Sequence, residues 1–185
     1  AETVQLENGK PAVELSFRFE ADLKLDNTDA MFCGHMDKLV SFNSQIFDMD
    51  HKTTKYYLDE RYFSSFNPDN QMTLYTIASQ IVYNQPSRGV MIDGAQVLVT
   101  MSRFKRGFTF RHRLELDEWL AEAKYYIKSG EGYVTHEFFP KNDKSCGNYG
   151  GCAFRAVCSS APNMRERLLQ ASFHRRAWDP LQIRG

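Results

Sequence analysis

The chain has 185 residues, of which 42% are hydrophobic, 14% aromatic and 25% charged, a balance typical of one folded domain with a substantial core. Lys plus Arg and Asp plus Glu both number 23, so the overall charge does not indicate a nucleic-acid, membrane or acidic partner, and any charged binding surface must be local. No stretch approaches the roughly 20 apolar residues of a membrane span, so we expect a cytoplasmic protein with no membrane partner.

Strands are predicted first along the chain. Apolar and polar residues alternate over residues 12–23, the period of a half-buried strand. Residues 31–40 and 45–52 are predicted as two further strands, and the sequence SFNS between them predicts a hairpin. Two later strands are expected over residues 90–101 and 108–114.

Helices are expected between and after these strands. Apolar residues recur at helical spacing over residues 71–83, with Asn67 before Pro68 as the expected cap. A second helix is predicted over residues 117–128, with Tyr126 on its buried side, and a short one over residues 163–170. We therefore predict a single α/β domain over residues 1–185, with a mixed central sheet flanked by helices and a cysteine-bearing C-terminal loop region at about residues 140–160.

Charged residues gather at the end of the second hairpin strand. Residues two apart share one face of a strand, so Asp48, Asp50 and Lys52 point one way and His51 the other, and the hairpin can bring Asp37 alongside. Clustered carboxylates repel one another unless a hard cation lies among them, and Mg²⁺ binds a few carboxylates together with water and phosphate oxygens. The alternative is an exposed edge strand, whose ion pairs contribute little.

Three motifs occur in order around these residues: Gly34-x-x-Asp37, Asp50-His51-Lys52 and Gln71-x-x-x-Tyr75. Together they resemble the PD-(D/E)xK nuclease superfamily. More narrowly, they resemble its RecB-type branch, which includes CRISPR-associated exonucleases and many bacteriophage exonucleases, and the phage-encoded proteins are the most similar. The resemblance extends over roughly residues 12–180 and implies a restriction-endonuclease-like fold.

The resemblance also implies roles for individual residues. Asp37 and Asp50 would bind a catalytic Mg²⁺ or Mn²⁺ ion, Lys52 would assist the attacking water, and Gln71 and Tyr75 would hold the DNA backbone. Glu14 is the expected additional acidic metal ligand, with Glu20 in reserve. Asp48 departs from the family pattern, which has an apolar residue there. It is expected either to lie behind the metal site or to face water.

The implied function is that of a divalent-metal-dependent DNA nuclease, an exonuclease in phage or bacterial DNA recombination, repair or replication. A phage-encoded protein would act in the host cytoplasm, on single-stranded DNA or duplex ends. One alternative is a non-cleaving module of the same fold that binds DNA ends. Another is a structural-metal or redox protein that uses the cysteines. The sequence indicates no oligomeric state.

Three cysteines, Cys146, Cys152 and Cys158, follow a C-x₅-C-x₅-C spacing in a glycine-rich segment. In the resembling exonucleases, one upstream and three C-terminal cysteines often hold a [4Fe–4S] cluster, which needs four ligands. Cys33 does not match the upstream position. Three options stay open: a cluster completed by Cys33 or by a non-cysteine ligand, a Zn²⁺ site that includes His136, or three reduced thiols packed in a loop.

The segment RFKRGFTFRHR, residues 103–113, interleaves cationic residues with three phenylalanines. Arg103, Lys105 and Arg106 are predicted to contact DNA. The alternative is a strand with phenylalanines in the core and cations in solvent, and we favour the core location for the phenylalanines. His35 and His51 flank the carboxylates and are expected to be packed or hydrogen-bonded residues rather than metal ligands.

Overall fold

The computed structural model describes residues 1–25, 28–176 and 179. Its contacts divide the chain into two compact units, one containing Ala1–Lys128 and the other spanning Ser129–Asp179. The helix α3 (Arg113–Thr135) crosses the boundary between them in sequence.

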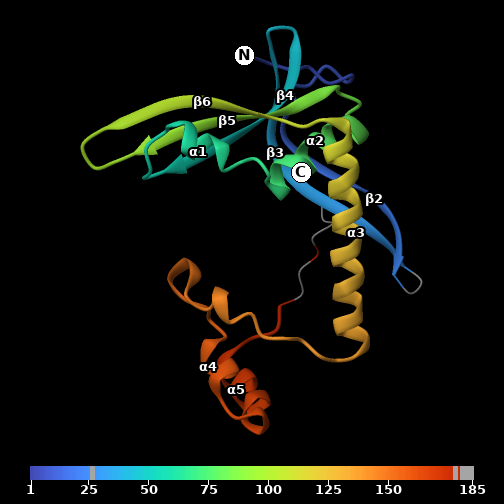
Figure 1. Cartoon of the computed structure of the whole chain (residues 1–185), viewed down its shortest axis with the longest axis vertical. Coiled ribbons are helices and arrows are strands. Elements are labelled where there is room, and N and C mark those ends of the chain that lie inside the picture. The colour runs from blue at the N-terminus through green and yellow to red at the C-terminus, as the bar shows by residue number, and fades with distance from the viewer. Residues whose placement is uncertain (26–27, 177–178, 180–185) are drawn as a thin grey trace. The chain divides into compact units, whose positions relative to one another are not determined.

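The first unit is built on a six-stranded mixed sheet (Figure 1). Strand β3 pairs with β1 and β2, and the order continues through β4, β5 and β6. The pair β4–β5 is parallel and the other pairs are antiparallel. These features confirm the predicted α/β class with a mixed sheet. The strands are β1 (Glu2–Thr3), β2 (Val13–Leu25), β3 (Thr28–Phe42), β4 (Gln45–Thr54), β5 (Ser87–Val97) and β6 (Ser102–Phe110).

Two helices, α1 (Glu60–Ser64) and α2 (Asn70–Ile81), connect the parallel strands β4 and β5. Asp69 caps α2, because its side chain accepts a hydrogen bond from the Met72 backbone N–H at 3.0 Å. The prediction of Asn67 as the cap is therefore wrong. The last predicted strand is also shifted, since β6 ends at Phe110 and α3 begins at Arg113. Tyr126 of α3 is exposed, contrary to expectation.

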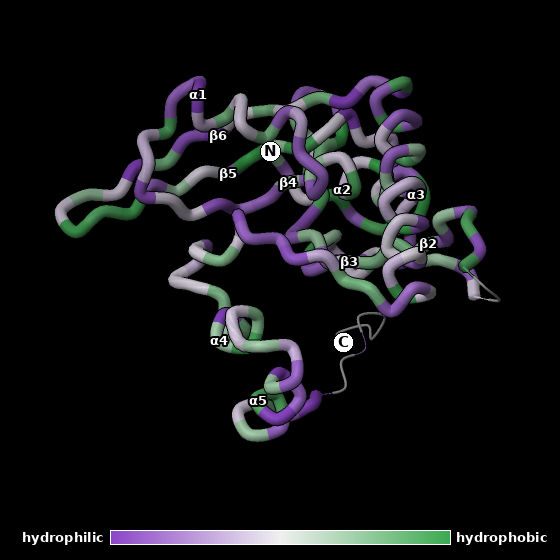
Figure 2. Tube along the Cα trace, turned by 60° about the horizontal axis from the view of Figure 1, so that its bottom comes forward, coloured by the Kyte–Doolittle hydropathy of each residue, from purple (hydrophilic) through white to green (hydrophobic). Residues whose placement is uncertain are grey.

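Apolar residues form a cluster on each face of the sheet. The larger cluster joins β2, β3 and β5 to α2 and to Leu116 near the start of α3, and the hydropathy-coloured trace in Figure 2 lets the reader follow these segments. The smaller cluster lies on the opposite face and includes Val40, Phe47, Met49 and Met91. Strand β4 gives Phe47 and Met49 to the smaller cluster, whereas Asp48 and Asp50 are buried on its other face and must find partners within the protein.

The hairpin between β3 and β4 sets the register of the central strands. Asn43 and Ser44 have φ values of 48° and 60°, the left-handed conformation that a tight two-residue hairpin turn requires. The turn aligns Val40 with Phe47 and Lys38 with Met49. A shift by one residue would move Asp48 and Asp50 to the opposite face, so this turn determines where the acidic residues point.

The second unit consists of short elements. It contains α4 (Arg155–Ser159), α5 (Arg165–Ser172) and three single-turn 3₁₀ helices, η1 (Asp143–Ser145), η2 (Asn148–Gly150) and η3 (Pro162–Met164). The prediction of a loop-rich region followed by a short helix agrees with this arrangement. Within residues 1–25, 28–176 and 179, no helix is both long and apolar enough to cross a membrane.

Candidate active site

The pairing of β3 with β4 brings two acidic residues of the resembled motifs together. The Oδ2 atom of Asp37 accepts a hydrogen bond from the His51 backbone N–H at 2.8 Å. This contact continues the ladder beyond the Lys38–Met49 pair and places Asp37 beside the end of β4. The negative charge of Asp37 is one of the causes that raise the pKa of Asp50, so the two carboxylates act on each other electrostatically.

Asp50 is buried, with 4% of its surface exposed. Burial is the main cause that raises its pKa, whereas the hydrogen bond and the positive charge of Lys52 lower it. The Lys52 Nζ atom lies 2.8 Å from Asp50 Oδ2. This buried oxygen has the Lys52 ammonium group as its close partner. A carboxylate oxygen carries two lone pairs, so Asp50 Oδ2 can accept a further cation beside the lysine.

Lys52 joins the strand motif to the helix motif. Its ammonium group donates to Gln71 Oε1 at 2.9 Å, and Gln71 Nε2 donates to the Tyr75 hydroxyl oxygen at 2.8 Å. Gln71 and Tyr75 lie one turn apart on the same face of α2, as their spacing predicts. Asp50, Lys52, Gln71 and Tyr75 thus form one continuous chain of polar contacts, which we call the polar relay.

Packing holds the helical end of the polar relay in place. The Tyr75 ring packs edge-to-face against Phe17 of β2, with 6.1 Å between the ring centroids. At the start of α2, Asn70 accepts a hydrogen bond from the Trp119 indole N–H of α3 at 2.8 Å. Arg111 Nε donates to Thr73 at 2.8 Å and ties the same turn to the end of β6. Burial of Tyr75 raises the pKa of its hydroxyl, which therefore stays neutral.

Asp48 lies on the same face of β4 as Asp50 but does not face water. Its side chain is 1% exposed and accepts hydrogen bonds from the hydroxyls of Ser79 in α2 and Ser87 in β5, the latter at 2.8 Å. Burial raises the pKa of Asp48 to about 7, against the lowering effect of the two serines. The expectation of an acid behind the site thus agrees with the structure. No sequence pattern pointed to Ser79 or Ser87.

Hard oxygen ligands fit the cation that the resembled family uses, because Asp37 lies beside the end of β4, where Asp50 offers a buried carboxylate. Across the described residues, however, no group of three or more His, Cys, Asp or Glu side chains is arranged to hold a metal ion. Glu14 is exposed and joins no such group. It therefore stays a prediction as a metal ligand, and Asp37 and Asp50 are the pair that the fold brings together.

The two flanking histidines have partners away from the polar relay. His51 Nδ1 lies 3.1 Å from Asp93 Oδ2, on the face opposite Lys52, as strand alternation predicts. His35 Nδ1 lies 2.8 Å from the Ser16 hydroxyl. Both contacts agree with the expectation of hydrogen-bonded residues rather than ligands.

The predicted DNA-binding cations divide between the two faces of β6. Arg103 and Lys105 lie near aromatic rings on the α1 side, 5.1 Å from the centroid of Tyr57 and 5.8 Å from that of Phe63. Arg106 instead pairs with Asp93 at 2.9 Å.

The phenylalanines of β6 are not buried. Phe104 is 77% exposed, and Phe108 and Phe110 are also exposed, although both contact the ring of Phe47. The favoured core location of these three residues is therefore wrong. Because β6 is an edge strand of the sheet, these side chains lie where little else covers them.

The cysteines of the second unit line one pocket. Cys146, Cys152 and Cys158 share a mainly apolar pocket of about 600 Å³ with residues that include Phe139, Pro140 and Arg155. All three are free thiols, and so is Cys33, which lies in β3 of the first unit. The three options for these cysteines therefore stay predictions, because no group of three such side chains among the described residues is arranged to hold a metal ion.

The fold and site define a mixed α/β protein with paired carboxylates and a lysine at the end of a central strand. No family model matches the chain, and no curated protein matches it. A search of solved structures finds a weak neighbour, titled "Crystal structure of SSO0001", with 11% sequence identity and a TM-score of 0.36. The aligned region covers 80% of this chain and 59% of that chain.

Proposed function

We propose that the chain is a divalent-metal-dependent DNA nuclease that hydrolyses phosphodiester bonds. The observation that carries this proposal is the polar relay, because it unites residues of two of the resembled motifs by contacts of 2.8 to 2.9 Å. An exposed acidic surface would not account for the burial of Asp50 or for its ammonium partner. The presence of Asp37, Asp50 and Lys52 together favours an enzyme over a non-cleaving DNA-end-binding module.

Each residue of the relay has a part in the proposed chemistry. Asp37 and Asp50 would hold the cation with their carboxylate oxygens. Lys52, held by Asp50 and Gln71, would donate hydrogen bonds to the attacking water or to a phosphate oxygen. Gln71 and Tyr75 would fix the direction of the lysine side chain. When bound, Mg²⁺ or Mn²⁺ supplies positive charge for the phosphate oxygens and acidifies the attacking water.

The decisive experiment is digestion of end-labelled single-stranded and duplex DNA by the wild type and by Asp50→Asn, with Mg²⁺, with Mn²⁺ or with chelator. We expect cleavage that needs the metal and is lost in the variant. Asp29→Asn is the matched control, because Asp29 is an exposed acid on β3 outside the relay. Metal-independent cleavage, or full activity of Asp50→Asn, would exclude the proposed site.

For the second unit we propose a structural metal centre that uses Cys146, Cys152 and Cys158, with a [4Fe–4S] cluster as the first candidate and Zn²⁺ as the second. The support for this proposal is that all three thiols line one pocket. Both centres need four ligands, so one ligand beyond the three cysteines is required. As part of the same proposal, the protein acts inside the cell, in phage or bacterial DNA metabolism.

A further inference from the structure

A pocket rich in tyrosine lies beyond the end of β4. It has a volume of about 450 Å³ and is lined by Tyr56, Tyr57, Asp59, Arg61, Tyr62 and Ser65. Tyr56 and Tyr57 are 67% and 60% exposed, although each could bury a large apolar ring. Neighbouring exposed aromatic side chains of this kind indicate a binding surface. We call these six residues the tyrosine pocket.

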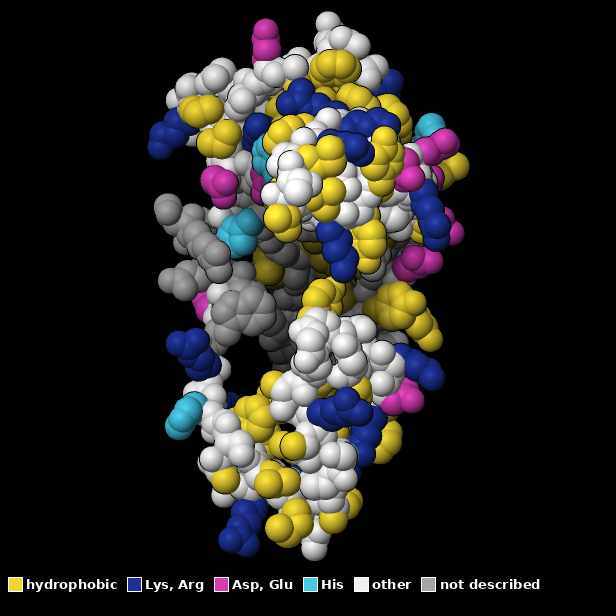
Figure 3. Space-filling model, turned by 90° about the vertical axis from the view of Figure 1, so that its left-hand side faces the viewer, with side chains coloured by type: hydrophobic (Ala, Val, Ile, Leu, Met, Phe, Trp, Pro, Cys, Tyr) yellow, Lys and Arg dark blue, Asp and Glu magenta, His cyan; other side chains and the backbone are white. Residues whose placement is uncertain are grey.

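Basic side chains accompany the rings of the tyrosine pocket. The Lys55 Nζ atom lies 5.7 Å from the Tyr56 centroid, and the Arg103 guanidinium carbon lies 5.1 Å from that of Tyr57. Figure 3, which views the molecule from the side of the β5–β6 hairpin, shows Lys and Arg side chains interleaved with hydrophobic ones over the first unit. Aromatic faces beside cations are the combination that binds single-stranded nucleic acid, since bases stack and phosphates pair with the cations.

The tyrosine pocket is formed by the segment that follows β4, the strand that carries Asp50 and Lys52. Burial is the main cause that raises the pKa of Tyr62, and the negative charge of Asp50 raises it further, so Tyr62 lies within the electrostatic reach of that carboxylate. Tyr62 also packs edge-to-face against Phe63 and Phe66, with ring centroids 5.2 Å and 5.4 Å apart. A group bound in the tyrosine pocket would therefore lie on the segment that follows the strand bearing Asp50 and Lys52.

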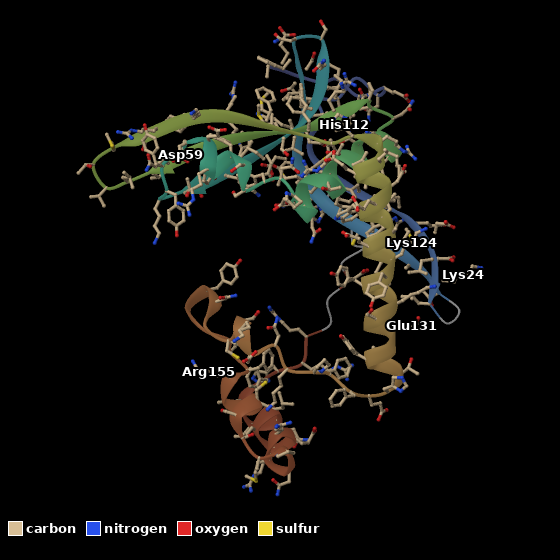
Figure 4. The ribbon with its side chains drawn as sticks, in the orientation of Figure 1. Lys24, Asp59, His112, Lys124, Glu131 and Arg155 are labelled. Carbon is tan, nitrogen blue, oxygen red and sulfur yellow. The ribbon has the colours of Figure 1, made fainter. Side chains whose placement is uncertain are left out.

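The walls of the pocket are held in place. Phe63 of α1 packs so closely on Gly107 of β6 that a Cβ atom at Gly107 would come within 2.1 Å of the ring. The Lys55 carbonyl accepts a hydrogen bond from Gln96 Nε2 at 3.2 Å, which fastens the segment after β4 to β5. Asp59, labelled beside α1 in Figure 4, accepts from the Tyr62 backbone N–H at 2.9 Å, so its charge is engaged at the helix start.

We propose that the tyrosine pocket stacks an unpaired nucleobase, and that the substrate at this site is single-stranded DNA. The inference rests on the proposed nuclease function and names its substrate class. In a duplex each base is already stacked and paired, so it would enter the pocket only after extrusion, which is unfavourable. An unpaired base meets no such barrier, and every base offers a π-face, so little sequence preference is expected.

The test is binding measured in chelator, where cleavage plays no part. Fluorescence anisotropy would compare a fluorescent single-stranded oligonucleotide with the matching blunt duplex, using the full chain. We expect the double variant Tyr56→Ala/Tyr57→Ala to weaken single-strand binding at least about 10-fold and to leave duplex binding within about twofold. Tyr56→Phe/Tyr57→Phe should keep the affinity, because it keeps the rings.

The control is Tyr125→Ala/Tyr126→Ala, another adjacent pair of exposed tyrosines in the first unit, which should leave binding unchanged. As a readout on the wild-type chain, a 2-aminopurine base in the single strand should be quenched on binding by stacking. Equal losses on both DNA forms, no loss, or no quenching would overturn the proposal. Failure of the nuclease proposal would appear separately, as full cleavage by Asp50→Asn.

Discussion

Lys52 connects strand β4 to helix α2 in the candidate site, because its two close partners come from these two elements. Asp50 belongs to the same strand and Gln71 belongs to α2. A lysine in water would sample many rotamers, so two partners that fix its ammonium group remove conformational freedom before substrate binds. The site is thus organised by side-chain contacts and not by the motif spacing alone.

Tyr75→Phe tests the last contact of the relay. The ring stays packed on Phe17, and only the hydroxyl that accepts from Gln71 is removed. We expect kcat for DNA cleavage to fall about 10-fold and the free energy of unfolding to change by less than about 1 kcal/mol. Tyr83→Phe is the matched control, since it removes a hydroxyl that bonds the Ser16 carbonyl outside the site. Equal rate losses in both variants would contradict the relay.

Asp48 makes the stability of the protein depend on pH. Its pKa of about 7 in the folded protein exceeds the ordinary 3.8, so the folded state binds the proton more tightly than the unfolded chain. Its contribution to the free energy of unfolding is therefore complete below the ordinary pKa. It falls by about 1.4 kcal/mol per pH unit as the pH rises from 3.8 to about 7.

Asp48→Asn should remove this dependence, because the amide carries no proton that titrates there. Urea unfolding at about pH 5 and about pH 8 would measure the free-energy difference between wild type and variant. We expect the difference to shift in favour of the variant at the higher pH. A constant difference at the two pH values would mean that Asp48 does not titrate in this range.

At the scale of elements, the β3–β4 hairpin and α2 together assemble the site. The turn at Asn43 and Ser44 sets the register that places Asp37 beside the end of β4. The cap at Asp69 and the contacts of Asn70 and Thr73 set where α2 begins. The parallel pairing of β4 with β5 requires a crossover, and α2 lies in that crossover, so the fold itself presents Gln71 to Lys52.

Glycine is required at position 34 of the first motif because the strand packs closely against β2 there. A Cβ atom there would lie 2.7 Å from Phe17 Cζ, so Gly34→Ala should lower the free energy of unfolding by about 1–3 kcal/mol. In a Phe17→Leu background the same substitution should cost less, because the smaller side chain leaves room. A double-mutant cycle from urea unfolding gives the coupling. Simple additivity of the two substitutions would show that the ring is not the obstacle.

At the scale of the whole molecule, the chain separates its chemistry into two compact units. The first unit holds the polar relay and the tyrosine pocket, and the second holds the three cysteines that line one pocket. Equal numbers of cationic and anionic residues conceal the local placement of Arg103 and Lys105 beside aromatic rings. Net charge therefore does not indicate this protein's partners, whereas the local placement of cations beside aromatic rings does.

Cys152→Ser tests the proposed metal centre of the second unit. Anaerobically purified wild type should carry bound iron with visible absorbance, or bound zinc, and the variant should lose most of it because one ligand is missing. Ser145→Ala, a change in the same pocket, should keep the metal. Metal analysis and absorbance spectra measure both variants. The proposal would be contradicted if the wild-type protein carried no stoichiometric metal. It would also be contradicted if Cys152→Ser bound as much metal as the wild type.

Much of the fold could be predicted from local patterns. Alternation identified β2, helical spacing identified α2, and the turn residues SFNS identified the β3–β4 hairpin, because each pattern depends on neighbours in sequence. Element ends were less accurate, as at Asn67 and Tyr126, since caps and burial depend on tertiary contacts. The exposure of Phe104 likewise follows from the position of β6 at the sheet edge.

The sequence by itself determined which residues of β4 share a face and that Gln71 and Tyr75 lie one helical turn apart, because strand and helix periods are local geometry. Only the tertiary structure decided that Asp48 is buried between Ser79 and Ser87, that Lys52 reaches Gln71, and that the Tyr75 ring packs on Phe17. Those facts depend on contacts between segments far apart in the chain. Solvent exclusion and through-space charge, which set the pKa of a carboxylate, exist only once those segments have packed.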